Sequence, residues 1–288
     1  MTRKNIFELL DEKYDIKSEM IKISDLFNGI EFLHVNPLNF HQEVYTIERL
    51  ADNIIACWKA RGSCLNCAEL KEKINLTQDF DDKENVLTTL EYYVNILFLI
   101  EQKVLPDRAF PLFGLPEYYM LSENIRLLLE HLNHQKIIIA EEEKVLLIPQ
   151  DPAATAVAEI TSNDDVAFAI MKYHHASLKG NLNEKKRLLL SIAHEYEPLL
   201  EKPVDGFTKY FDDANNMLNN AHIRHNNKSG RDRKELIANM SDEDLEKWYD
   251  ELYQLLLFCV LAKDNKERKE KIHDFLNSIN SKPDKNKE

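Results

Sequence analysis

The stretch SDEDLEKWYDELYQLLLFCV, Ser241 to Val260, decides the fold class of this chain. Its apolar residues recur every three or four positions, which is the period of an amphipathic helix. Ser241 and Asp244 form a capping box, so we expect the helix to begin there. Trp248 and Tyr249 lie on its apolar side and are expected to anchor it to neighbouring helices.

The same period occurs on the N-terminal side of this stretch. Val166 to Tyr173 forms one apolar stripe, and Phe207 to Ala221 forms another. Asn181, with Glu184 three residues later, predicts the start of a further helix. We therefore expect a C-terminal helical bundle over residues 161–280, followed by a polar tail at 281–288 that is predicted to be disordered.

The first half of the chain also predicts helices, with one exception. Residues 48–58, 86–104 and 125–132 carry helical spacing, so residues 1–135 are expected to form an N-terminal helical region. Lys136–Ala140 and Lys144–Ile148 are short β-branched runs typical of a β-hairpin. Residues 153–160 fit either a third strand or the approach to a helix. The prediction is a mainly α fold, a helical bundle with a small β-hairpin insert at 136–160.

Composition narrows the functional classes. The 288 residues carry a net charge of −13, which argues against binding DNA or an anionic membrane through overall charge. The longest apolar runs are too short to span a bilayer, and the start lacks a signal-peptide core, so a cytoplasmic protein is expected. Cys64 and Cys67 lack a second Cys/His pair at zinc-finger spacing. No metal or cofactor is expected, and a zinc or redox protein is the least favoured class.

The stretch NNAHIRHNNKSGRDRKEL, residues 219–236, is the main candidate for chemistry. If the helical stripe of 207–221 continues, Arg224 and His225 lie on its apolar face, where a guanidinium needs a carboxylate, phosphate or carbonyl partner. The alternative is an ordinary helix end, where Arg and His interact with the last carbonyls and Asn226–Asn227 supply a left-handed exit.

Such a group can cleave a phosphodiester without metal. A histidine can transfer the proton of an attacking ribose hydroxyl, and an arginine can stabilise charge on the phosphoryl oxygens. We predict Arg224 as the charge-stabilising residue and His225, helped by His222, as the proton carrier. Asp250 could instead pair with Arg224 across two helices, without catalysis. The loop cations are predicted to bind RNA, namely Lys228, Arg231, Arg233 and Lys234. Polar residues are predicted to support the site, namely Asn219, Asn220, Asn226 and Asp250.

A helix that ends in Arg224-His225, followed by a polar turn and a long helix, resembles the HEPN superfamily. That resemblance covers about 166–280 and implies an all-helical bacterial domain, often a metal-independent RNase of toxin–antitoxin or phage-defence systems, which acts as a dimer with its site at the paired faces. The sequence departs from the family motif because Ser229, Gly230 and Arg231 occupy the positions of the second histidine.

Two classes of function follow. The resemblance implies a metal-independent endoribonuclease or RNA-binding effector of bacterial defence that forms a homodimer. The alternative is a non-catalytic helical interaction or regulatory protein with a protein partner. An RNase predicts Arg224 open to a cleft or to a two-fold interface lined with basic side chains, whereas an interaction protein predicts Arg224 sealed against Asp250 or another acid and a large apolar patch elsewhere.

Overall fold

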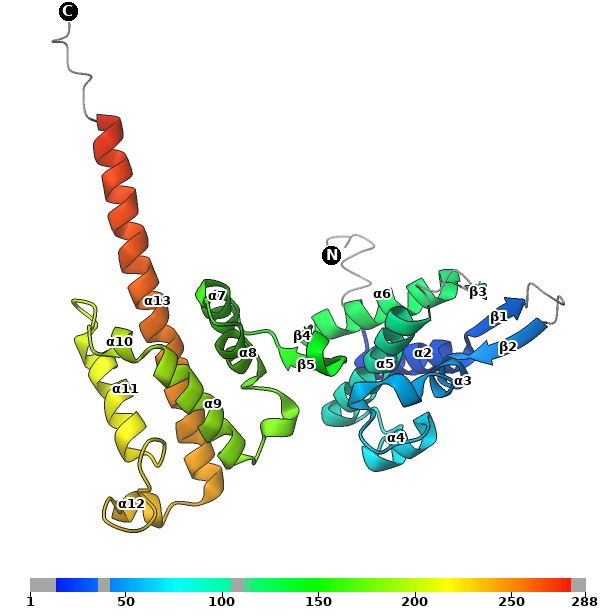
Figure 1. The fold of residues 1–288 in the computed structure, drawn as a ribbon, viewed down its shortest axis with the longest axis horizontal. Coiled ribbons are helices and arrows are strands. Elements are labelled where there is room, and N and C mark those ends of the chain that lie inside the picture. The colour runs from blue at the N-terminus through cyan, green and yellow to red at the C-terminus, as the bar shows by residue number, and fades with distance from the viewer. Residues whose placement is uncertain (1–13, 36–41, 105–111, 114, 281–288) are drawn as a thin grey trace, which may run out of the picture. The chain divides into compact units, whose positions relative to one another are not determined.

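The computed structural model describes residues 14–35, 42–104, 112–113 and 115–280. The chain divides into two compact units, unit 1 (residues 1–149) and unit 2 (residues 150–288). Most of the described residues are helical and the strands form two small sheets, so the predicted mainly α fold with a small hairpin is confirmed (Figure 1). The tail at 281–288 lies outside the described residues.

Unit 1 is built around one long, buried helix, α5. Capping side chains explain where several of its helices begin: Asp15, Asn66 and Asp82 each accept a hydrogen bond from a backbone N–H in the first turn. The buried face of α5 packs in one apolar core with the other helices of the unit. The helices are α2 (Ile16–Gly29), α3 (Ile47–Asp52), α4 (Cys67–Lys73), α5 (Lys83–Lys103) and α6 (Leu115–His131).

A three-stranded antiparallel sheet corrects the expectation that residues 1–135 are helical throughout. Strand β1 (Glu31–Val35) lies between β2 (Gln42–Thr46) and β3 (Leu112–Phe113). The expected helix over 48–58 is shorter, because α3 ends at Asp52 and a 3-10 turn follows at Ile55–Cys57.

The predicted hairpin is confirmed. Strand β4 (His134–Ile139) pairs antiparallel with β5 (Lys144–Pro149) in the register Ile137 to Leu146. The side chain of Asn95, on α5, both donates to the Val145 carbonyl and accepts from its N–H, at 2.7 and 2.8 Å. The hairpin therefore belongs to unit 1, and the division of the chain falls where β5 ends.

Unit 2 is helical, and the ambiguous residues 153–160 are part of its first helix. The predicted caps are present: Asn181 Oδ1 accepts from the Glu184 N–H at 3.2 Å, and Ser241 Oγ accepts from the Asp244 N–H at 3.1 Å. The helices are α7 (Pro152–Ile160), α8 (Asp164–Lys172), α9 (Leu182–Glu195), α10 (Glu197–Leu200), α11 (Thr208–Asn220), α12 (Glu235–Ala238) and α13 (Asp242–Asn280).

Helix α13 organises unit 2. Its first half packs against α7, α9 and α11 (Figure 1). Tyr249 is buried there as expected, but Trp248 is 50% exposed, so its predicted anchoring role is wrong. The second half of α13 extends beyond the other helices of the unit, and every described residue from 267 to 279 is exposed. No helix in the described part of the chain has the length and apolar character needed to cross a membrane.

Candidate functional site

The stretch that follows α11 does not continue the helix. Helix α11 ends at Asn220, and His222 adopts a left-handed backbone conformation with φ of 64°. The N–H of Arg224 then donates to the Leu218 carbonyl at 2.8 Å, which folds the chain back on the helix end. The prediction that Arg224 and His225 extend the apolar face of α11 is therefore wrong; in their place Ile223 is buried.

Asn227 holds this turn together. Its side chain is almost fully buried, and its Oδ1 accepts from the His222 N–H at 2.7 Å while its Nδ2 donates to the Asp232 carbonyl at 3.0 Å. Its own N–H donates to His222 Nδ1 at 3.2 Å. The left-handed exit predicted at Asn226–Asn227 is thus made by His222, and Asn227 contributes hydrogen bonds instead.

The three residues predicted to act together lie in different surroundings. Arg224 Nη2 lies 3.1 Å from Glu197 Oε1 on α10, and the arginine side chain is 24% exposed. His225 is exposed. Asp250 pairs with Lys185 and not with Arg224, so the partner proposed for the arginine was wrong although the requirement for a carboxylate was met. His222 lines a cleft.

This His222 cleft lies between the N-terminal ends of α9 and α13 and the turn after α11. It has a volume of about 210 Å³. The backbone N–H groups of the first turn of α9 form the positive end of the helix dipole at its edge. Its lining residues are Gly180, Asn181, Leu182, Asn183, Lys186, His222, Lys228, Asp242 and Tyr249.

The cleft carries an excess of positive charge. Lys228 Nζ lies 2.6 Å from Asp242 Oδ1, so these two lining charges compensate each other. Within the described residues no carboxylate pairs with the ammonium of Lys186, and burial lowers its pKa. Because an unpaired cation in a partly buried position is costly, Lys186 favours an anionic ligand at this place.

His222 is held as a hydrogen-bond donor. Because its Nδ1 accepts from the Asn227 N–H, the proton of the neutral ring lies on Nε2. Burial lowers the pKa of His222, and the charges of Lys186 and Lys228 lower it further, so the ring is neutral at pH 7. A neutral ring with Nδ1 occupied and Nε2 protonated can donate to a phosphate oxygen, but it has no free lone pair to act as a base.

The other predicted residues surround the cleft or make local contacts. Arg231 is exposed, while Arg233 Nη1 lies 2.9 Å from Glu235 Oε2. The backbone N–H of Lys234 donates to the Asn227 carbonyl and closes the loop. Among the polar residues predicted to support the site, Asn219 is partly buried on α11, Asn220 bonds the Asn216 carbonyl, and Asn226 bonds Ser229.

A buried charge cluster behind the cleft fixes α9 against α13. Lys185 is 5% exposed, and its Nζ lies 2.8 Å from Glu246 Oε1 and 2.7 Å from Asp250 Oδ1. Glu246 also accepts from the N–H of Gly180, at the edge of the cleft. The Lys185 ammonium lies 5.3 Å from the Tyr173 ring centroid. The sequence did not single out Lys185 or Lys186, because adjacent lysines on a helix usually mark a solvated face.

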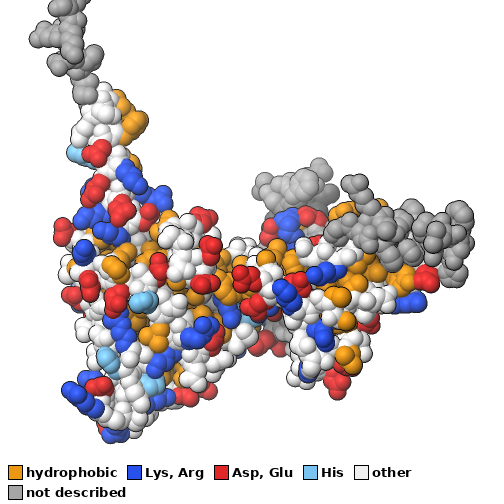
Figure 2. Space-filling model, viewed as in Figure 1, with side chains coloured by type: hydrophobic (Ala, Val, Ile, Leu, Met, Phe, Trp, Pro, Cys, Tyr) orange, Lys and Arg blue, Asp and Glu red, His pale blue; other side chains and the backbone are white. Residues whose placement is uncertain are grey.

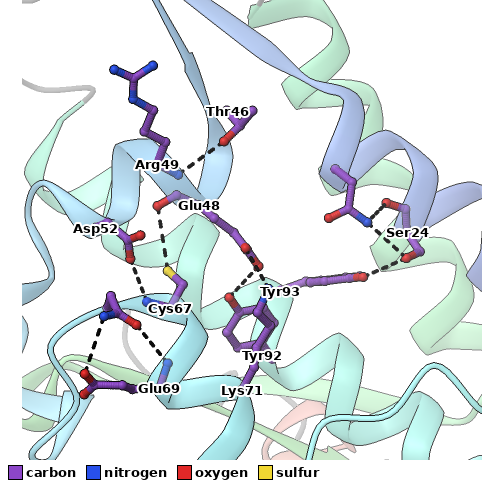
Figure 3. Close-up of polar contacts among 12 residues, drawn as sticks. Ser24, Thr46, Glu48, Arg49, Asp52, Cys67, Glu69, Lys71, Tyr92 and Tyr93 are labelled. Atoms are coloured by element: carbon purple, nitrogen blue, oxygen red, sulfur yellow. Dashed lines mark hydrogen bonds and ion pairs between the residues drawn. The ribbon is translucent and has the colours of Figure 1, made fainter.

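Of the two cysteines, Cys67 belongs to a hydrogen-bonded network in unit 1 (Figure 3), and Cys64 is a buried free thiol. The N–H of Cys67 donates to Asp52 Oδ1 at 2.6 Å, and its thiol lies 3.8 Å from the Glu48 carbonyl. Glu48 in turn binds Tyr92 and Lys71. Burial raises the pKa of the Cys67 thiol, and Asp52 raises it further, which opposes thiolate chemistry. Among the residues that the structure describes, no His, Cys, Asp and Glu side chains form a group that could hold a metal.

No protein-family model, no curated protein and no solved structure matches this chain. The functional interpretation of the His222 cleft therefore rests on the geometry of its own residues.

Proposed function

We propose that unit 2 binds the phosphate backbone of RNA at the His222 cleft and holds it without cutting it. The observation that carries this proposal is the ammonium of Lys186, which pairs with no carboxylate of the described residues and lines the same cleft as His222 and the N-terminal end of α9. An ammonium, a neutral N–H donor and a helix N-terminus are all suited to phosphate oxygens.

The cations of the loop after the cleft extend this surface along a strand. Lys228 lines the cleft, and Arg231 and Arg233 follow it in an exposed loop. They can contact flanking phosphates without reading the base sequence. Because the rest of the chain is acidic, binding would be confined to this patch. The geometry of the cleft supports a phosphate ligand, and the HEPN resemblance is the reason to expect that RNA carries this phosphate. The role in bacterial defence is a prediction from the same resemblance.

The geometry favours binding over cleavage. Attack by a ribose hydroxyl needs a base, and the available form of His222 is a donor. The guanidinium of Arg224, predicted to stabilise the transition state, is engaged by Glu197. In excess chelator we expect the protein to leave labelled RNA intact. Cleavage that is lost in both Arg224→Ala and His225→Ala would overturn this view and support the metal-independent nuclease.

RNA binding is tested by fluorescence anisotropy with a labelled single-stranded RNA. We expect affinity to fall between about 50 and 200 mM salt, and Lys186→Gln to weaken binding by roughly threefold to tenfold with a salt slope smaller by about 0.7. Lys209→Gln is the matched control, because it removes an exposed lysine near the opposite end of α11. Equal affinity in the wild type and Lys186→Gln, or no binding by the wild type, would remove the cleft from consideration.

A further inference from the structure

The second half of α13 carries an apolar stripe that contacts none of the other helices described in unit 2. Ile272, Phe275, Leu276 and Ile279 recur at helical spacing and are 49–63% exposed. Figure 2 shows hydrophobic side chains near the far end of this helix. Isolated exposed apolar residues are ordinary, but four on one face of an unpacked helix indicate a surface for a partner.

The stripe does not continue the face by which α13 packs in unit 2. Leu276 follows Phe258 by about five turns, so both side chains leave the helix in nearly the same direction. Phe258 is partly exposed, whereas Leu252 and Leu256, on the other side of the helix, are in the core. The outward face of α13 is therefore apolar near the middle of the helix, at Phe258, and again at 272–279.

Beside Phe258 the surface forms an apolar groove. The Phe258 ring centroid lies 5.5 Å from that of Phe207 and 4.9 Å from that of Tyr210, at the start of α11. The groove has a volume of about 810 Å³, an apolar floor that includes Val204 and Leu261, and charged residues farther along α13. Its apolar floor and charged margin suit the apolar face of an amphipathic helix.

The stripe cannot fill the groove of its own chain. The stripe and one wall of the groove lie on α13, a continuous helix of 39 residues. Leu261, in the groove, and Leu276, in the stripe, are separated by about 22 Å along the helix axis. A stripe and a groove that lie along the same straight helix can come into contact only if another molecule supplies one of them.

We propose that a second copy of this chain covers the face, with the two α13 helices antiparallel about a two-fold axis near Arg268. In that arrangement Leu276 of each copy enters the groove of the other at Leu261, and both contacts form at once. A self-complementary interface of this kind closes as a dimer. The exposed parts of the stripe and of Phe207, Tyr210 and Phe258 amount to roughly 400–700 Å² per copy, which is half or more of the ~800 Å² typical of a stable interface.

Sedimentation of the full-length protein tests this pairing. We expect the wild type to be a dimer and Leu276→Glu to weaken self-association by about tenfold or more. Asn277→Glu places the same charge on the same turn, off the stripe, and should remain a dimer. A monomeric wild type, or a Leu276→Glu variant that pairs as well as the wild type, would overturn the proposal. So would a monomeric wild type that cosediments with anionic vesicles, which would assign the stripe to a membrane surface.

Cross-linking tests the direction of the pair. In a Cys57→Ser background, Arg268→Cys should form a disulfide with its counterpart near the two-fold axis, whereas Ile279→Cys should not. Cross-linking by both variants would indicate a parallel pair and overturn the antiparallel arrangement. The stripe and groove lie apart from the His222 cleft, which involves the first turns of α13, so loss of dimerisation and loss of RNA binding are separable results.

Discussion

Replacing Lys185 with methionine tests whether the buried charge cluster holds unit 2 together. Methionine keeps the length and the apolar stem, but leaves Glu246 and Asp250 without their shared cation. Removing one partner of a buried ion pair costs about 3–5 kcal/mol, because the remaining charge stays desolvated. Asp250 is more exposed than Glu246 and can recover water, so we expect a loss of about 3 kcal/mol in the free energy of unfolding.

The pH dependence of this loss identifies its cause. Burial acts to raise the pKa of Glu246, but hydrogen bonds from Lys185 and the Gly180 N–H hold it below its usual value of 4.5. In the wild type the carboxylate therefore contributes stability above pH 4.5 that is lost as the pH falls through the folded-state pKa. Without Lys185 burial dominates and raises the pKa, so ionising Glu246 costs stability. The deficit of Lys185→Met should grow from pH 4 to pH 7.

Urea unfolding followed by Trp248 fluorescence measures this deficit. Trp248 is in unit 2, and a Trp58→Phe background removes the other tryptophan of the chain. Lys247→Met is the matched control, because that lysine is exposed and pairs with Asp244, which is also exposed at the surface. A deficit below about 1 kcal/mol, or one equal at pH 4 and pH 7, would refute the role of the cluster in fixing α9 to α13.

Three further predictions concern the turn and the cysteines. Asn227→Ala should cost about 1–3 kcal/mol and speed amide exchange over residues 222–232, because it leaves the His222 N–H and the Asp232 carbonyl unsatisfied; unchanged exchange would contradict this. The fold lowers the pKa of His222, so the neutral ring is the form that stabilises the turn. Lowering the pH below 6.5 should therefore speed amide exchange in the same turn, and His222→Gln should abolish this effect. In the native protein a thiol reagent should label only Cys57, because the thiols of Cys64, Cys67 and Cys259 are buried. Fast labelling of a Cys57→Ala variant would contradict this prediction.

Sequence reasoning was most successful where the decisive interactions are local. The caps at Asn181 and Ser241 each involve a side chain and a backbone N–H three residues apart, so the pattern and the structure contain the same information. The hairpin was predicted for the same reason, since its strands are neighbours in the chain. Strand β3 has only two residues and pairs with β1, far away in sequence, so no local period marks that pairing.

The cleft could not be predicted by period because its residues come from three separate elements. Lys186 is on α9, His222 follows α11, and Asp242 opens α13. The prediction that the apolar stripe of α11 continues to Arg224 assumed that the helix continues. The sequence has no glycine where the helix stops, so the usual signal of a helix end is missing there.

An asparagine can favour a helix end in two ways, because it tolerates a left-handed backbone and its amide can replace helical hydrogen bonds. At Asn227 the second property prevails. Its amide accepts the His222 N–H that a longer helix would have used, and so the left-handed strain falls on the histidine. The same turn that directs the His222 ring to Asn227 directs the Arg224 side chain to Glu197. The turn that Asn227 holds thus directs the side chains of His222 and Arg224, two residues apart in the sequence, to different partners.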